Sequence, residues 1–478
     1  MVTSASPSDG GAVTSRVPVG VPTRDELRRV FALAVPILGG QMSTAVAGLI
    51  DVAMIGHLGA GAVAAVGFGV LVFWVTVSLT IGVEAATQTL TARRKGEGRL
   101  DATGPILSEA LRLSLLIGIP LGGALAFLAP TILAQLHEDP TIRGHGADYL
   151  TARALSLPLV MGVAAFRGFY NGTSRPWSHL RVALVMLATQ ALLNWVLIFG
   201  MFGFPRLGVL GAGIAAGCAC GIGLATFVYL ARVDHQHGVF RFAPNPEQRT
   251  RLRRALLRLG LPSGVQWALS WIAMLVFLFF AGLVGVVEAA ASYLLIQVVS
   301  LLSLTANSFG FAAASLVSQA LGKHEPEYAY RSGLVSGCLA AGLLGTVGIG
   351  LAVFRDPLLS ALSTDAHLIA VAKPALMACG LVASMDAFGI VMNFALIGAG
   401  AARRVMIWNL AGMWLICLPV AWALGVRGPA GMLGLWGALL GARLIVGLVM
   451  SFSFHQRGWA SLRLLGSEQP GMSSMEHT

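Results

Sequence analysis

The chain has 478 residues, of which 56% are hydrophobic and only 11% are charged. A soluble domain carries roughly 25% charged residues, so the composition excludes an ordinary soluble globular protein. The apolar residues fall into long runs separated by short polar breaks. Since a run of about 20 apolar residues spans the hydrocarbon core of a bilayer as a helix, we predict an all-α polytopic membrane protein.

Twelve apolar runs are long enough to cross a membrane. The predicted spans are 30–56, 62–85, 106–136, 149–170, 181–202, 209–231, 256–284, 289–312, 332–354, 370–397, 404–426 and 432–454. They follow a tail at 1–29 that is predicted to be disordered, and a second polar tail occupies 455–478. The 59 glycines fit this reading, because small side chains let membrane helices pack closely.

The first span contains an acid, Asp51, inside the apolar stretch from Val35 to Gly56. A carboxylate in the hydrocarbon region costs roughly 2.5–3.5 kcal/mol on insertion scales. Acids at such positions usually handle a proton, an ion or a substrate, although pairing with a neighbouring helix for packing alone is the alternative. Asp51 is therefore the first candidate functional residue.

The formal net charge of +11 is distributed as in a membrane protein. If the N-terminus is cytoplasmic, the tails and inner loops hold 24 of the 32 Lys and Arg residues, and the outer loops hold five. The other three, Arg112, Arg153 and Arg443, fall within or at the ends of spans. This positive-inside bias predicts that both termini are cytoplasmic. It also makes membrane lipids, and not nucleic acid, the expected partners of the basic residues.

The sequence offers no sign of an enzyme. The five cysteines lie in apolar spans without metal-ligand spacing to a histidine, and no paired acids or His motifs occur within the spans. No Gly-rich phosphate-binding loop is present either. We therefore expect no catalytic activity and no cofactor, and we expect energy for any transport to come from an ion gradient.

An internal repeat relates the two halves of the chain at an offset of 226 residues. The matched positions are Pro36 and Pro262, Gly59 and Gly285, Ala64 and Ala290, Gly172 and Gly398, and the segments 207–212 and 433–438. Six spans per half is an even number, so both halves enter from the same side and are related by a pseudo-two-fold axis along the membrane normal. This predicts an N-lobe at 30–231, a cytoplasmic linker at 232–255 and a C-lobe at 256–454. A site between two such lobes would lie near the midplane, with alternating access by rocking.

Three segments resemble a known family. Ala32–Gly59, Leu192–Gly217 and Gly260–Gln266 resemble the first, the fifth and sixth, and the seventh spans of the multidrug and toxic compound extrusion (MATE) transporters. The resemblance covers about residues 25–455 and looks strongest for the NorM-like branch, with the DinF-like branch second. It implies a V-shaped antiporter of the bacterial inner membrane that expels amphipathic, often cationic drugs in exchange for Na⁺ or H⁺. We expect it to work as a monomer.

The resemblance assigns three candidate residues in the N-lobe. Asp51 matches the first-helix acid that is the main coupling residue of that lobe, and Asn194 matches the fifth-helix position that faces it. Gln190 lies one helical turn before Asn194. Because positions four apart share a helix face, both amides are predicted to address the cavity of Asp51.

The C-lobe candidates form a less complete set. Asp386 matches a tenth-helix acid of a proposed cation or substrate site. Gln297 and Asn393 either line the same cavity or serve as hydrogen-bond partners between helices. Ser270 stands where the NorM-like pattern has a Glu, and Val382 stands where it has a Tyr. This cation cage is therefore incomplete, which shifts the expected ion coupling to the N-lobe.

Burial in apolar surroundings disfavours the charged form of a carboxylate, so Asp51 is suited to bind a proton. A proton and a cationic drug would exclude each other there, and such exclusion lets the two ligands favour opposite states. H⁺ is thus the favoured coupling ion. Na⁺ stays open because Asp51, Gln190 and Asn194 could supply oxygen ligands. The alternative function is a lipid-linked precursor flippase, which would favour more basic residues along the central cavity than the few seen here.

Overall fold

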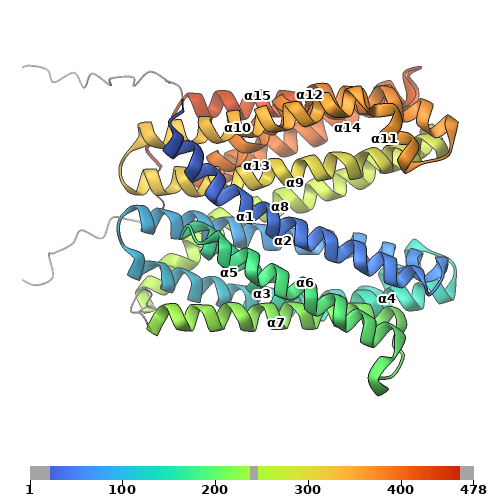
Figure 1. Ribbon diagram of the computed structural model, residues 1–478, viewed down its shortest axis with the longest axis horizontal. Coiled ribbons are helices and arrows are strands. Elements are labelled where there is room, and N and C mark those ends of the chain that lie inside the picture. Colours follow the sequence, from blue (N-terminus) through green and yellow to red (C-terminus); the bar gives the residue numbers. More distant parts are fainter. Residues whose placement is uncertain (1–21, 237–245, 463, 465–478) are drawn as a thin grey trace, which may run out of the picture.

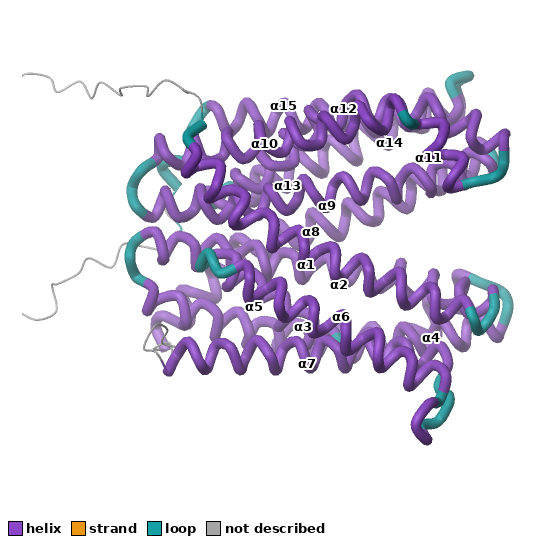
Figure 2. The backbone as a smooth tube through the Cα atoms, in the orientation of Figure 1, coloured by secondary structure: helices purple, strands orange, loops and turns teal. Residues whose placement is uncertain are grey.

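The structure is a computed structural model that describes residues 22–236, 246–462 and 464. Its longer helices are α1 (Arg24–Gly56), α2 (Ala60–Gly96), α3 (Thr103–Leu136), α4 (Pro140–Leu155), α5 (Leu157–Gly172), α6 (Pro176–Phe199), α7 (Gly208–Gln236), α8 (Pro246–Val284), α9 (Val286–Gly322), α10 (Pro326–Val353), α11 (Arg355–Leu362), α12 (Ala366–Ala399), α13 (Ala402–Leu410), α14 (Leu418–Ala421) and α15 (Gly431–His455). Short 3₁₀ turns occupy Leu100–Ala102 and Met201–Gly203, and π-helical turns at Ala411–Cys417 and Trp422–Arg427 join α13 and α14 into one span. Figure 2 shows helices throughout this part of the chain, with the loops gathered at its two ends.

The predicted twelve membrane-spanning helices are confirmed for the described residues. Eleven spans are continuous, and the fourth consists of α4 and α5, which meet at a bend of 48°. The bend has a covalent cause: Pro158 lies in the first turn of α5 and has no N–H to donate to the carbonyl of Ala154. This span is longer than the predicted 149–170, because α4 starts at Pro140, where Asp139 caps it by accepting from the Thr141 N–H at 2.8 Å.

The first helix begins earlier than predicted. Residues 24–29, expected to belong to the tail, form the first turns of α1. Thr23 and Glu26 make a capping box, in which the Thr23 hydroxyl accepts from the Glu26 N–H at 3.3 Å and the Glu26 carboxylate accepts from the Thr23 N–H at 2.8 Å. Of the predicted linker 232–255, residues 237–245 lie outside the described residues; α7 continues to Gln236 and α8 begins at Pro246.

The helices form two lobes, as the repeat predicts. In Figure 1, α1–α7 make one group and α8–α15 make the other. The repeat positions have equivalent places in both: Gly59 and Gly285 precede α2 and α9, and Pro36 and Pro262 lie inside α1 and α8. The two-lobe architecture of the prediction is therefore confirmed.

The lobes are joined by their first helices, which cross over at the end nearest the chain termini. Val30 and Leu33 of α1 are buried in the main core of the C-lobe, whereas Ile55, at the other end of α1, belongs to an N-lobe core. Leu252 and Leu256 of α8 are buried in an N-lobe core in the same way. Figure 1 shows the two groups converging at this end and diverging toward the other.

Amide side chains form hydrogen bonds across the contact between the lobes. Gln88 donates to the Phe311 carbonyl at 2.7 Å and to the Ser315 hydroxyl at 2.8 Å. Gln319 donates to the Gly172 carbonyl at 3.0 Å. Buried amides that bond to backbone carbonyls of the opposite lobe fix the register of the helices.

Ion pairs lie at the outer margin of the same contact. Glu109 of α3 pairs with Arg253 of α8 at 2.9 Å, and Glu26 of α1 pairs with Arg331 of α10 at 2.6 Å. The hydrogen bonds between the lobes in the described part of the chain lie in the halves of the helices nearest the termini or, for Gln41, near the middle of its helix. The lobes are thus closed against each other at that end.

Glycines allow this closure. A Cβ at Gly96 would lie 2.0 Å from the Gln319 carbonyl oxygen, and a Cβ at Gly322 would lie 2.2 Å from that of Arg93. These two contacts are exchanged by the 226-residue offset, so the pseudo-two-fold axis passes between α2 and α9. Gly82 approaches α8 as closely, since a Cβ there would lie 2.1 Å from the Gly260 carbonyl oxygen.

Gly82→Leu is expected to push α2 away from α8 and to shift the protein out of the conformation that is closed at the terminal end. Gly123→Leu is the matched control, because Gly123 is also helical and a Cβ there meets nothing within 4 Å. Distances between spin labels on the two lobes would check this. Identical distance distributions in the Gly82→Leu and Gly123→Leu variants would contradict it.

Candidate functional site

Asp51 is held by two amides of α6. Gln190 Nε2 donates to both carboxylate oxygens, at 2.9 and 2.8 Å, and Asn194 Nδ2 donates to Oδ1 at 2.5 Å. The structure therefore brings together the three residues that the sequence placed in one N-lobe site. Their spacing explains the fit: Gln190 and Asn194 are four residues apart and share a face of α6, and α6 packs along α1.

Asp51 and Asn194 are both buried. The Asp51 side chain belongs to a residue that is 9% exposed, and Asn194 is fully buried. Hydrogen bonds to a charged group count for more when water is excluded. The site is thus a single buried carboxylate to which two amides of α6 donate.

The side-chain oxygen of Asn194, Oδ1, is buried and accepts no hydrogen bond from the described residues. An amide offers both a donor and an acceptor, so Asn194 can donate to a charged Asp51 and, after turning, accept from the O–H of a protonated one. An orphaned buried acceptor costs free energy, and a proton or a cation beside Asp51 would relieve that cost.

Arg153 is a basic residue that acts on Asp51 electrostatically. It extends from α4 and stacks over the Phe73 ring at 4.4 Å from its centroid. Its hydrogen bonds do not reach the carboxylate, which is bonded by the two amides. The cation–π contact lowers the cost of keeping a guanidinium at this depth.

Among the described residues, the other acids that are buried or half-buried between the helices have arginine partners. Glu84 pairs with Arg167 at 2.8 Å, Glu109 pairs with Arg253 at 2.9 Å, and Asp386 pairs with Arg443 at 2.8 Å. No ion pair to Asp51 is present in the described residues. Asp51 is therefore the buried carboxylate that is left free to take a mobile cation.

The predicted C-lobe residues are not gathered into one site. Arg443 donates from Nε to Asp386 Oδ1 and from Nη2 to Oδ2, both at 2.8 Å, so both carboxylate oxygens are engaged. Asn393 instead donates to the Asn409 side chain at 3.2 Å, and Gln297 is exposed and donates to the Tyr293 hydroxyl at 3.5 Å. A role for Asn393 and Gln297 in a C-lobe cation or substrate site stays a prediction.

Sequence reasoning missed the partners Arg153 and Arg443. From the sequence, both are only basic residues within or at the ends of predicted spans. A signal was available, because an intramembrane arginine calls for a buried acid or an aromatic face nearby. Nothing in the sequence said which helices would bring such a partner within reach. Ser270, the departure from the NorM-like pattern, bonds back to the Gln266 carbonyl of its own helix at 2.7 Å.

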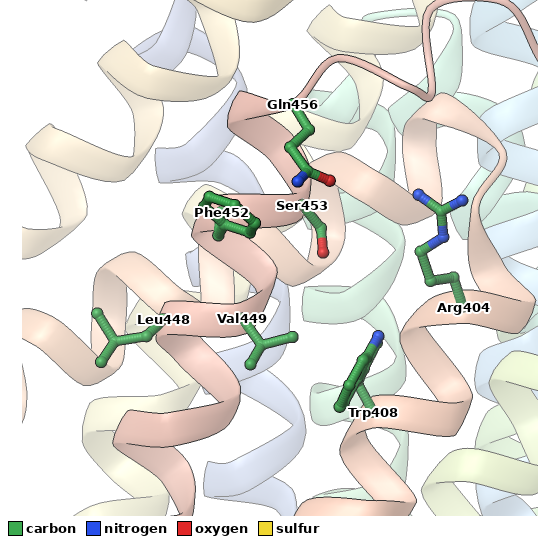
Figure 3. Close-up of a pocket in the computed structure, with 7 residues that line it drawn as sticks. All are labelled: Arg404, Trp408, Leu448, Val449, Phe452, Ser453 and Gln456. Atoms are coloured by element: carbon green, nitrogen blue, oxygen red, sulfur yellow. The ribbon is translucent and has the colours of Figure 1, made fainter.

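A cavity of about 610 Å³ lies away from both carboxylates, between α13 and α15. Figure 3 shows its lining, with Arg404 and Gln456 near one end and Trp408, Leu448 and Phe452 along it. Leu448 and Phe452 are largely exposed. In the described residues, no group of three His, Cys, Asp or Glu side chains could hold a metal ion.

Comparisons with known proteins agree with the fold and its repeat. The MatE family model matches residues 36–196 and again residues 262–423. The probable multidrug resistance protein NorM of Aromatoleum aromaticum is 29% identical over 436 residues, which cover 89% of this chain and 93% of that protein. The multidrug resistance protein PmpM of Pseudomonas aeruginosa is 29% identical over 429 residues, covering 88% and 89%.

Solved structures show the same architecture at lower identity. An outward-facing multidrug resistance MATE family transporter of the MOP superfamily superposes with a TM-score of 0.82 at 18% identity, covering 92% of this chain and 98% of that one. The Vibrio cholerae MATE transporter VcmN in its bent form gives a TM-score of 0.81 at 18% identity, covering 91% and 97%.

The bond from Asn194 to Asp51 should be measurable as a coupling. Asn194→Ala is expected to lower the free energy of unfolding by roughly 1–3 kcal/mol, because it removes a hydrogen bond to a charged group. In an Asp51→Ala background the same substitution should cost much less. Equilibrium unfolding in mixed micelles, arranged as a double-mutant cycle, checks this. An equal cost in both backgrounds would show that Asn194 acts through packing alone.

Proposed function

This chain belongs to the multidrug and toxic compound extrusion (MATE) family, with NorM-like relatives, and we propose that it exports amphipathic, cationic drugs or toxic metabolites in exchange for protons. Members of this family are transporters and not enzymes. The proposed site of action is the bacterial inner membrane, with both termini in the cytoplasm. The names of the relatives, which are multidrug resistance proteins, support the substrate class.

One observation carries the choice of ion-coupled export: Asp51 is a buried carboxylate held by amides instead of a fixed counterion. A carboxylate that already has a permanent cation has little to gain from binding another. Asp51 can instead take up a proton or lie opposite the cationic group of a drug. The two ligands compete for the same oxygens, so each favours the state in which the other is released.

The amides suit a proton in particular. When Asp51 is charged, Gln190 and Asn194 donate to it. When it is protonated, its O–H donates to the amide oxygen of Asn194, whose present lack of a partner is then corrected. For Na⁺, both amides would have to turn so that their oxygens face the ion, and water would have to complete its coordination, because Gln190 and Asn194 now present N–H groups to Asp51.

The end at which the lobes are closed indicates to which side of the membrane this conformation opens. If the termini are cytoplasmic, the contacts through Gln88 and Gln319 close the cytoplasmic side, and Asp51 belongs to a state that opens outward. Drug leaves and a proton enters in this state. Rocking of the lobes about α1 and α8, which cross between them, then opens the other side.

The flippase alternative is less well supported. A lipid-linked precursor would require unpaired basic groups to hold its phosphates. Of the two arginines deep within the spans near the carboxylates, Arg443 is bonded to Asp386 and Arg153 stacks on Phe73. Of these two, only Arg153 is left without an acid partner in the described residues.

Asp51→Asn is expected to abolish ethidium efflux while leaving expression intact, because the amide keeps the shape and hydrogen bonds of the carboxylate but cannot release a proton. Asp148→Asn is the matched control, since it makes the same chemical change at an exposed position of α4 in the same lobe. Efflux from cells and from proteoliposomes would be measured. Normal efflux by Asp51→Asn would refute the mechanism.

An imposed pH gradient without Na⁺ should drive ethidium transport in proteoliposomes. The sign follows from the exchange: the compartment from which protons flow must be the one into which the drug is moved. A Na⁺ gradient at uniform pH should drive little transport. Transport that requires Na⁺ would replace the proton by Na⁺ as the ion bound at Asp51.

A further inference from the structure

The C-lobe contains an ion pair between Asp386 and Arg443. Asp386 extends from α12 and Arg443 from α15, and the two side chains meet through two parallel hydrogen bonds of 2.8 Å. Ser303 of α9 also lies 3.4 Å from Arg443 Nη2. Such a bidentate contact is the strongest form of a guanidinium–carboxylate pair and fixes both partners in one plane.

The pair has no counterpart in the other lobe. At the 226-residue offset, Asp386 corresponds to Val160 and Arg443 corresponds to Gly217. In the reverse direction, Asp51 corresponds to Phe277. The repeat thus places the two carboxylates at unrelated positions, and each lobe is apolar where the other is charged. Asp386 is not the C-lobe equivalent of Asp51, and its chemistry must be argued from its own neighbours.

Those neighbours leave little room for a second cation. A cavity of about 20 Å³ adjoins the pair, lined mostly by apolar side chains of α9, α10, α12 and α15. This volume holds about one water molecule. An arginine does not lose its proton in a protein, so the carboxylate keeps its counterion at every working pH.

We propose that Arg443 is a tethered counter-cation that fills the cation position of the C-lobe, so that Asp386 binds neither the coupling ion nor the cationic group of the drug. Arg443 is then the residue that determines where an ion can bind: it neutralises the C-lobe carboxylate and leaves Asp51 as the sole exchangeable site. The inference about coupling rests on the antiport function proposed above. The inference about cation binding at Asp386 does not.

Removal of the tether should uncover a cation site. Arg443→Gln keeps a polar side chain of similar reach but leaves Asp386 without a charge partner. The thermal stability of the purified variant is expected to rise as NaCl replaces choline chloride at constant ionic strength, because an ion that binds only the folded state stabilises it by mass action. The unmodified protein and the double variant Asp386→Asn/Arg443→Gln should show no such dependence. An equal response to Na⁺ in the unmodified protein and in both variants, or none in Arg443→Gln, would overturn the proposal.

The double variant also tests the proposal by transport, including the case in which Arg443→Gln alone does not fold. A buried pair can often be replaced as a unit at little cost, whereas the loss of one partner is damaging. Ethidium efflux by Asp386→Asn/Arg443→Gln should therefore stay within about twofold of the unmodified protein, while Asp51→Asn serves as the inactive control. A folded double variant that has lost efflux would show that the Asp386 carboxylate itself binds ion or drug.

The two measurements separate this proposal from the proposed function. Thermal stability against Na⁺ is read without transport, so it still decides whether Arg443 covers a cation site if the unmodified protein moves no ethidium. If the unmodified protein exports no ethidium, this would count only against the proposed function, the export of cationic drugs. It would leave the inference about Arg443 to the measurement of thermal stability.

Discussion

A charge between membrane helices must find compensation inside the protein, because lipid tails supply none. The buried and half-buried acids of the described helices meet the requirement in two ways. Glu84 and Asp386 have arginines as permanent partners, whereas Asp51 has amides, which lower the cost of the charge without cancelling it. This difference in compensation separates acids that hold the structure together from the one that is suited to exchange an ion.

The same constraint shapes the contact between the lobes. The lobes meet largely through close backbone approaches at glycines and through amide side chains that donate to carbonyls of the opposite lobe. Contacts of this kind are specific in register. Among the larger apolar side chains in these cores, those of α1 and α8 reach across to the opposite lobe, and this crossing joins the two lobes.

The repeat makes the fold symmetric but leaves the chemistry asymmetric. Gly96 and Gly322 are exchanged by the offset and make equivalent contacts, as packing across a pseudo-two-fold axis requires. Asp51 and Asp386 are not exchanged by it. Symmetry is therefore kept where the helices of the two lobes touch and is absent at the two carboxylates.

The sequence by itself determined the class of protein, the twelve spans, the repeat and the grouping of Asp51, Gln190 and Asn194. These follow from patterns along the chain: apolar run length is set by bilayer thickness, and positions four apart share a helix face. The tertiary structure decided the rest. The pairing of Asp386 with Arg443 and the end at which the lobes are closed both depend on how helices distant in the chain approach one another. Residues 386 and 443 lie on α12 and α15, and no local pattern fixes the rotation of one helix against another; packing of the whole lobe does.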